Sequence, residues 1–184
     1  MDSYTNRGSS LFTTFTTVLF AVATLNHITS YFYSPAPLAK ISIPKNNAVE
    51  YSHYKSYNSD QVKFEFDLTL DLTSEFNWNV NQIYVFVVAT YETKKNKKNE
   101  VVIYDKILRD LKDYKLDLKN SKIKYALRDE FAGSLADLDI TLTVRYQVMP
   151  IFGLLRIKEL PNKARFRVPS EYNKGVSVSK GARR

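Results

Sequence analysis

An uncharged segment near the N-terminus constrains this chain more than any other feature of its sequence. Residues 8–39 contain no Asp, Glu, Lys or Arg, although 25% of the chain is charged. Residues 11–32 are mostly apolar and, at about 1.5 Å per residue, would form a helix of roughly 33 Å, enough for a hydrocarbon core of about 30 Å. The sequence therefore predicts a transmembrane helix over residues 11–32, with apolar positions Leu11, Phe12, Phe15, Val18, Leu19, Phe20, Val22, Leu25, Ile28 and Tyr31.

The flanks of this segment favour an anchor that stays attached. Tyr31 and Tyr33 stand where interfacial aromatic residues are expected, and Pro35 cannot continue a helix. A cleaved signal peptide is the alternative, but its apolar region usually has about 7–15 residues, and Arg7 is the only basic residue before this one. Charge does not decide the orientation, because Arg7 lies on one side and Lys40 and Lys45 on the other, which only mildly favours a cytosolic C-terminus.

The rest of the chain is basic and carries the whole net charge of +8. The clearest cluster is Lys94–Lys98, and a looser one lies in the C-terminal residues 171–184. These patterns fit a solvated hairpin tip and a flexible tail, or else attraction to anionic lipid headgroups or an acidic partner. Nucleic acid is not an expected partner, because no recognition motif accompanies the lysines.

No group of residues predicts a catalytic, cofactor or metal site. The chain has no cysteine and only two histidines, His27 inside the apolar segment and His53 in a Tyr/Ser-rich stretch. Neither has a nucleophile and an orienting carboxylate at a spacing typical of a hydrolase, and they are too few for a metal site. The acids Glu65, Asp67 and Asp71 share one strand face and are expected to be solvated.

Alternation of apolar and polar residues predicts strands after the apolar segment. Residues 62–72 and 138–148 alternate without a miss, which is typical of strands with one buried and one solvated face. Residues 82–91 are nearly all apolar and predict a strand covered on both faces. Shorter strands are expected near 41–43 and at 101–104, 123–127, 154–157 and 164–168, whereas 106–115 fits a helical turn or a loop.

These strands predict an all-β fold class, an antiparallel β-sandwich preceded by one transmembrane helix. The expected organisation is a short N-terminal tail (1–10), the transmembrane helix (11–32), a linker with the first strand (33–61), the β-sandwich (62–170) and a basic flexible tail (171–184).

The most distinctive local string surrounds the only tryptophan, at residues 71–83. In one interpretation, Phe76 and Trp78 plug the edge of the core while Asn77 and Asn79 cap the turn. In the other, the aromatic residues form a contact patch for another protein.

Several motifs in order along the chain resemble one family, subunit 3 of the eukaryotic signal peptidase complex. Residues 71–93 (DLTSEFNWNVNQIYVFVVATYET), 99–107 (NEVVIYDKI) and 139–150 (DITLTVRYQVMP) resemble its segments. Asp139 stands where related members often carry a glycosylation acceptor, and Tyr104 stands where Trp is common. The matching positions of the first segment are Phe76, Trp78, Asn79, Gln82, Val85, Ala89 and Tyr91.

The resemblance implies a non-catalytic accessory subunit with a cytosolic N-terminus, one span of the endoplasmic reticulum (ER) membrane and a lumenal β-sandwich. Its implied partners are membrane lipid, the catalytic subunit that supplies the serine protease chemistry, and other subunits of a hetero-oligomer. Phe76, Trp78, Asn79 and Gln82 are the candidate partner-contact or motif-core residues. A membrane-tethered recognition or adhesion domain is the alternative, although such domains usually carry cysteine pairs or glycosylation acceptors, and both are missing here.

Overall fold

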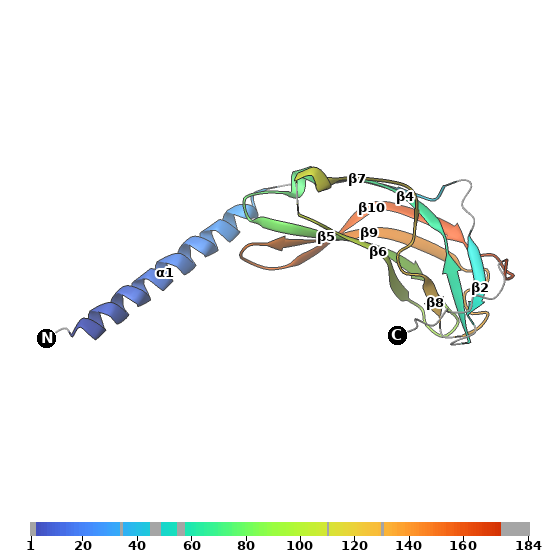
Figure 1. Ribbon diagram of the computed structural model, residues 1–184, viewed down its shortest axis with the longest axis horizontal. Helices are drawn as coiled ribbons and strands as arrows, with labels where there is room; N and C mark the ends of the chain where they lie inside the picture. The colour runs from blue at the N-terminus through green and yellow to red at the C-terminus, as the bar shows by residue number, and fades with distance from the viewer. Residues whose placement is uncertain are drawn as a thin grey trace, which may run out of the picture.

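The computed structural model describes residues 3–33, 35–44, 49–54, 58–109, 111–129 and 131–173. Over these residues, a single long helix, α1 (Tyr4–Ser30), is followed by strands and two short 3-10 turns (Figure 1). The strands are β1 (Leu38–Ser42), β2 (Glu50–Tyr54), β3 (Ser59–Lys63), β4 (Glu65–Asp71), β5 (Val80–Tyr91), β6 (Asn99–Leu108), β7 (Lys115–Lys122), β8 (Leu127–Asp129), β9 (Asp139–Pro150) and β10 (Arg156–Arg167), and the turns are η2 (Thr73–Glu75) and η3 (Leu111–Tyr114).

Helix α1 begins before the predicted segment and ends just inside it. Ser3 caps its N-terminus by accepting a hydrogen bond from the Thr5 backbone N–H. Its threonines are accommodated within the helix, because their hydroxyls donate to carbonyls one turn back, as Thr17 does to Thr13 at 2.8 Å. No residue of α1 is buried, and the helix is long and apolar enough to cross a membrane.

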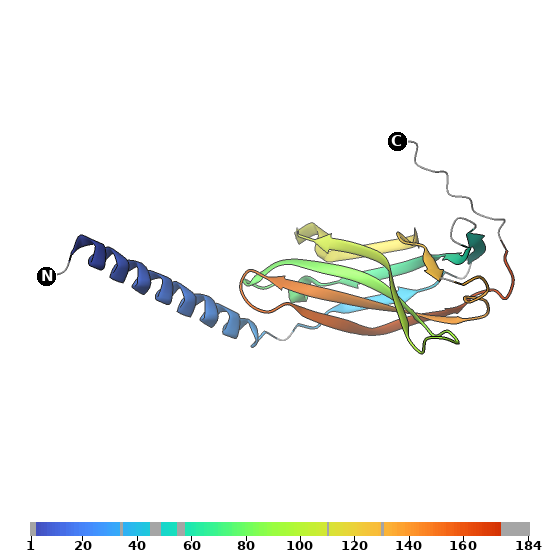
Figure 2. The ribbon, with the colours of Figure 1, turned by 90° about the horizontal axis from the view of Figure 1, so that it is seen from below.

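The strands form antiparallel sheets that pack over one core. The order is β10-β9-β5-β6 in the largest sheet, β1-β4-β7 in the second and β2-β3-β8 in a third, smaller one. Residues of β4, such as Leu68, share a buried cluster with Val85 of β5 and Leu142 of β9, so the first two sheets pack face to face. The chain is therefore one apolar helix followed by an antiparallel β-sandwich, as predicted, and α1 extends from one end of it (Figures 1 and 2).

The predicted strand 62–72 is wrong in one respect, because the structure divides it between two sheets. β3 ends at Lys63 and pairs with β2 and β8, whereas β4 begins at Glu65 and pairs with β1 and β7. Phe64, between them, is 3% exposed and keeps the inward position of the alternation. The period of two therefore continues through the change of sheet and gives no sign of it.

The shorter predictions differ in a similar way. The two expected strands at 154–157 and 164–168 form one strand, β10, whose register shifts between Glu159 and Lys163. Residues 123–126 join β7 to β8 rather than forming a strand, and the ambiguous region 106–115 contains the end of β6 and the turn η3.

A buried carboxylate organises the end of the sandwich opposite α1. Asp60 of β3 is 0% exposed and accepts hydrogen bonds from the hydroxyls of Tyr51 (2.7 Å) and Tyr172 (2.8 Å). It also accepts from the backbone N–H groups of Gly133 and Leu135, each at 3.0 Å. Burial raises the pKa of the Tyr51 hydroxyl most, and the hydrogen bond to Asp60 raises it further. One side chain thus connects β2, the 131–135 turn and the last described residues.

An ion-pair network on the outer face of the large sheet should make the fold sensitive to acid. Hydrogen bonds from Arg145 and then Lys98 lower the pKa of Glu100 from 4.5 to about 2. Because the folded pKa is the lower one, the stabilisation is present above about pH 4.5 and is lost as the pH falls towards about 2. The Glu100 side chain is 30% exposed, so we expect solvent screening to limit the contribution to about 1 kcal/mol.

Chemical unfolding of the full chain in detergent tests this expectation. Glu100→Gln should be about 1 kcal/mol less stable than the parent near pH 7, and the difference should vanish near pH 2. Glu92→Gln, at an exposed position, is the matched control and should follow the parent at each pH. A difference between Glu100→Gln and the parent that does not change with pH would contradict the assignment.

Candidate functional site

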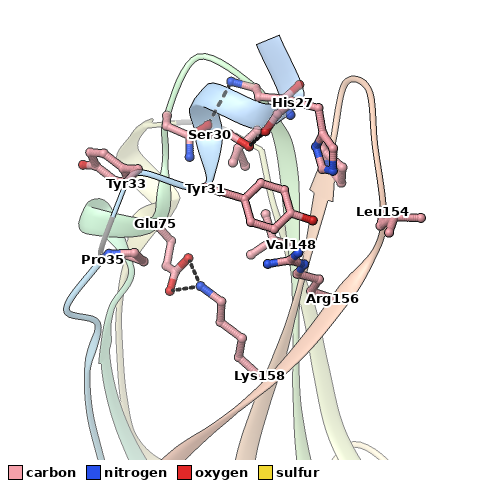
Figure 3. A pocket seen from close by; sticks show the side chains of 14 residues that line it. His27, Ser30, Tyr31, Tyr33, Pro35, Glu75, Val148, Leu154, Arg156 and Lys158 are labelled. Carbon is pink, nitrogen blue, oxygen red and sulfur yellow. Dashed lines mark hydrogen bonds and ion pairs between the residues drawn. The ribbon is translucent and has the colours of Figure 1, made fainter. Parts of the chain in front are cut away.

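The C-terminal end of α1 lies against the sandwich, and we call this contact the joint. It is formed by residues 26–33 from the helix side, and by residues 75–79 and the β9–β10 loop (residues 151–155) with Arg156 and Lys158 from the sandwich side. Figure 3 shows the loop rising beside the last turns of α1, with the side chains of Tyr31 and Arg156 between them. The joint decides how the sandwich is held relative to α1.

Asn79 is the central hydrogen-bonding residue of the joint. It is 1% exposed. Its Nδ2 donates to the Phe152 carbonyl at 2.9 Å, and its Oδ1 accepts from the Phe152 N–H and from Asn26 Nδ2, each at 3.2 Å. Its own carbonyl accepts from the Ile151 N–H at 2.7 Å. One buried amide thus binds α1 and the β9–β10 loop together, and such a satisfied network favours a single geometry.

The β9–β10 loop passes close to His27, and a glycine permits the approach. Gly153 has a φ of +124°, and a Cβ placed there would lie 2.1 Å from His27 Nδ1. The His27 ring also meets Tyr31 edge to face at 5.0 Å, and the Arg156 guanidinium lies 3.9 Å above the Tyr31 ring. The loop, α1 and the start of β10 are therefore in direct contact.

A small cavity of about 120 Å³ lies beneath these contacts and is lined by both polar and apolar side chains. Glu75, 3% exposed, accepts from Lys158 Nζ at 2.9 and 3.0 Å (Figure 3). It also accepts from the Tyr146 hydroxyl. Burial and the bond to Glu75 raise the pKa of Tyr146. The Glu75 carboxylate and the Lys158 ammonium are paired with each other. The cluster therefore holds η2, which carries Glu75, against β9 (Tyr146) and β10 (Lys158).

Among the described residues that line the cavity, none is a nucleophile activated by a base. Ser30 and His27 both line it, but the Ser30 hydroxyl donates to the His27 backbone carbonyl at 2.6 Å rather than to the imidazole. A hydrolytic pair requires the opposite arrangement, with the hydroxyl hydrogen-bonded to a ring nitrogen.

The four candidate residues from the sequence lie in different environments. Phe76 is half-buried and stacks on Tyr114, with ring centroids 3.4 Å apart. Asn79 is buried in the joint, and Gln82 accepts a hydrogen bond from Arg109 at 2.9 Å on the surface of the sheet.

The first of the two interpretations is wrong for Trp78, which does not plug the edge of the core. Its side chain is 59% exposed and touches Tyr33 edge to face, with ring centroids 6.4 Å apart. Asn77 explains part of this orientation, because its Oδ1 accepts from the Asn79 N–H at 2.9 Å and closes a tight turn around Trp78.

Sequence reasoning missed most of the joint. Glu75, Arg156 and Lys158 carry no local pattern that marks them, and their partners lie far along the chain. The available signal was the single glycine within the apolar run at 151–155.

The lysine hairpin at 94–98 lies at the end of the sandwich away from α1 (Figure 2). There, Lys95 Nζ lies 4.8 Å from the centroid of the Phe131 ring. This position favours a solvated hairpin tip over contact with a membrane entered by α1.

Comparison with known proteins identifies the family. The model of the family described as "Signal peptidase subunit" matches residues 1–171. Signal peptidase complex subunit 3 of Gallus gallus and that of Homo sapiens are each 34% identical over 158 residues, covering 84% of this chain and 87% of each relative. Adipocyte-related X-chromosome expressed sequence 1 of Mus musculus is 34% identical over 178 residues, covering 94% of this chain and 97% of the relative. The chain therefore belongs to the signal peptidase subunit family and is a non-catalytic accessory subunit.

Proposed function

We propose that this subunit holds its β-sandwich at the lumenal face of the ER membrane and braces the catalytic subunit while signal peptides are removed. α1 spans the membrane with a cytosolic N-terminus. Its apolar positions from Leu11 to Ile28 face lipid or neighbouring helices, except Phe20, which also contacts the β9–β10 loop. Its length and composition and the exposure of its apolar side chains, such as Phe15 at 64%, support this placement. Family membership favours it over the alternative of a tethered adhesion domain.

The joint is the observation that carries the bracing role. A domain on a flexible linker would sample many orientations, and a partner would have to select one of them. Here Asn79, the β9–β10 loop and the Arg156–Tyr31 contact hold α1 against the sandwich. Membrane anchoring confines the search for the partner, and a fixed orientation removes part of the ordering cost of binding.

Trp78 is the residue we assign to contact with the catalytic subunit. It is the largest side chain exposed beside the joint, and Tyr33 extends the same aromatic surface. Exposed tryptophan and tyrosine are common anchors of protein interfaces, because they bury a large area with few rotatable bonds.

We expect Trp78→Ala to impair binding of the catalytic subunit and to leave folding nearly unchanged. Its exposure predicts a stability cost below about 1 kcal/mol, whereas loss of an interface anchor of about 2 kcal/mol would weaken binding about 30-fold. Affinity purification from gently solubilised membranes, with partners quantified by mass spectrometry, measures the recovered serine-protease-type subunit.

The control for Trp78 is Phe131→Ala, because Phe131 is also an exposed aromatic residue, at 54%, but contacts Lys95 of the lysine hairpin, away from the joint. It should recover the catalytic subunit as the parent does. Equal recovery by Trp78→Ala would remove Trp78 from the interface, and recovery of the parent chain alone would contradict the bracing role.

A single substitution tests the topology. Asp139 is exposed and is followed by Ile140 and Thr141, so Asp139→Asn creates a glycosylation acceptor in a chain that has none. If the sandwich is lumenal, this variant should acquire a glycan that endoglycosidase removes. Asp139→Gln removes the same charge without creating an acceptor and should stay unmodified. An unmodified Asp139→Asn variant would contradict the lumenal placement.

A further inference from the structure

The β9–β10 loop exposes a continuous apolar surface. Ile151 is 70% exposed, Leu154 70% and Leu155 61%, and no charged residue occurs between Arg145 and Arg156. An exposed apolar cluster of this kind in a secreted or lumenal domain usually marks a contact with lipid or with another protein.

The loop lies along α1 rather than beyond its end. The rings of Phe152 and Phe20 meet edge to face, with centroids 6.2 Å apart, and Gly153 lies against His27. Phe20 is ten residues before Ser30, the last residue of α1, which is about 15 Å along the axis at about 1.5 Å per residue. The tip of the loop therefore reaches a level well inside the apolar segment of the helix.

We infer that the β9–β10 loop inserts into the membrane leaflet on the side of the sandwich, with Ile151, Phe152, Leu154 and Leu155 among the acyl chains. This rests on the proposed function in one respect, that α1 spans the membrane. The loop is then a second membrane contact, which acts with α1 to set the angle of the sandwich.

If the β9–β10 loop stayed in water, too little of the apolar segment of α1 would remain to cross the membrane. The part of α1 in contact with the loop would then be in water too, leaving residues 11–19 as the remaining apolar segment. Nine residues make about 14 Å of helix, against a hydrocarbon core of about 30 Å. Insertion of the loop removes this conflict, because the helix can span at full length.

The residue that follows the loop, Arg156, suits this placement. Arg156 follows the loop directly, and its guanidinium lies 3.9 Å above the ring of Tyr31, at the end of α1. Tyrosine and arginine are both favoured at the level of the headgroups, where an aromatic ring and a charged group meet polar lipid atoms. The chain therefore leaves the hydrocarbon at Arg156, as α1 does at Tyr31.

Spin labelling of the full chain in phosphatidylcholine nanodiscs tests the inference. The sequence has no cysteine, so single labels are introduced with Leu154→Cys and Ile151→Cys in the loop, Leu19→Cys in α1 and Lys119→Cys in solvent. Lys119 is the aqueous control, with a side chain 80% exposed on β7. Molecular oxygen is concentrated in lipid, whereas a soluble nickel chelate stays in water. The ratio of a label's collision rate with oxygen to its collision rate with the chelate therefore reports the depth of the label.

We expect both loop labels to give a ratio several-fold above that of Lys119→Cys and in the range of Leu19→Cys. If the Leu19→Cys label reports lipid but both loop labels report water, loop insertion is overturned and the span of α1 is not affected. Loop labels shielded only after the other subunits are added would show a protein contact and would also overturn it. An aqueous Leu19→Cys label would overturn the span and the insertion together.

Discussion

Asp60→Ala is expected to lower the free energy of unfolding by about 3–5 kcal/mol. The carboxylate is 0% exposed and accepts from Tyr51, Tyr172, Gly133 and Leu135. Alanine leaves two backbone N–H groups and two hydroxyls without their acceptor and opens a cavity at the same place. The bonds from the Tyr51 hydroxyl and the Leu135 N–H are buried, so the loss of these two is not offset by solvation.

Urea unfolding of the full chain in detergent, followed by circular dichroism, measures this loss. Asp60→Asn keeps the volume but can accept through one oxygen only, so its loss should be smaller than that of Asp60→Ala. Asp117→Ala is the matched control, because its carboxylate is 59% exposed and its loss should cost within about 0.5 kcal/mol. If Asp60→Ala cost no more than this control, the buried cluster would not organise that end of the sandwich.

The helix and the long strands could be predicted because their signals are local. The uncharged segment marks α1, and the runs at 82–91 and 138–148 correspond to β5 (Val80–Tyr91) and β9 (Asp139–Pro150). Composition and a period of two are properties of consecutive residues, so they can be recognised without knowing what packs against the segment. The change of sheet at Phe64 escaped the same reasoning, because the alternation continues through it.

The joint could not be predicted because its contacts are distant in sequence. Asn79 stood out as a residue that favours turns, but its partners are Asn26 and Phe152, which are 53 and 73 residues away. The sequence left Trp78 either at the edge of the core or in a contact patch, whereas the turn that Asn77 closes directs it outward. A preference for burial gives an average tendency and does not give the direction of one side chain.

Asn79→Ala is expected to uncouple α1 from the sandwich and to cost about 2–4 kcal/mol of stability. It removes the acceptor of Asn26 Nδ2 and of the Phe152 N–H, and the donor to the Phe152 carbonyl. Spin labels at Leu11→Cys and Lys119→Cys report the distance between helix and sandwich. Their distance distribution in nanodiscs should be narrow in the parent and broad in Asn79→Ala.

Asn81→Ala is the control for this measurement, because Asn81 lies two residues away on β5 and is exposed. Its distance distribution and stability should match those of the parent. A narrow distribution in Asn79→Ala would show that the remaining contacts, including Gly153 against His27, hold the joint without the amide.

The same variant separates orientation from direct contact with the catalytic subunit. Asn79 is 1% exposed, so a partner cannot reach its side chain while the joint is formed. If the joint braces the complex, Asn79→Ala should slow cleavage of preproteins by a reconstituted complex even though Trp78 and its surface are intact. Slower cleavage together with a broad distance distribution would therefore assign the defect to the angle of the sandwich, whereas full cleavage with a broad distribution would show that this angle does not matter for the reaction.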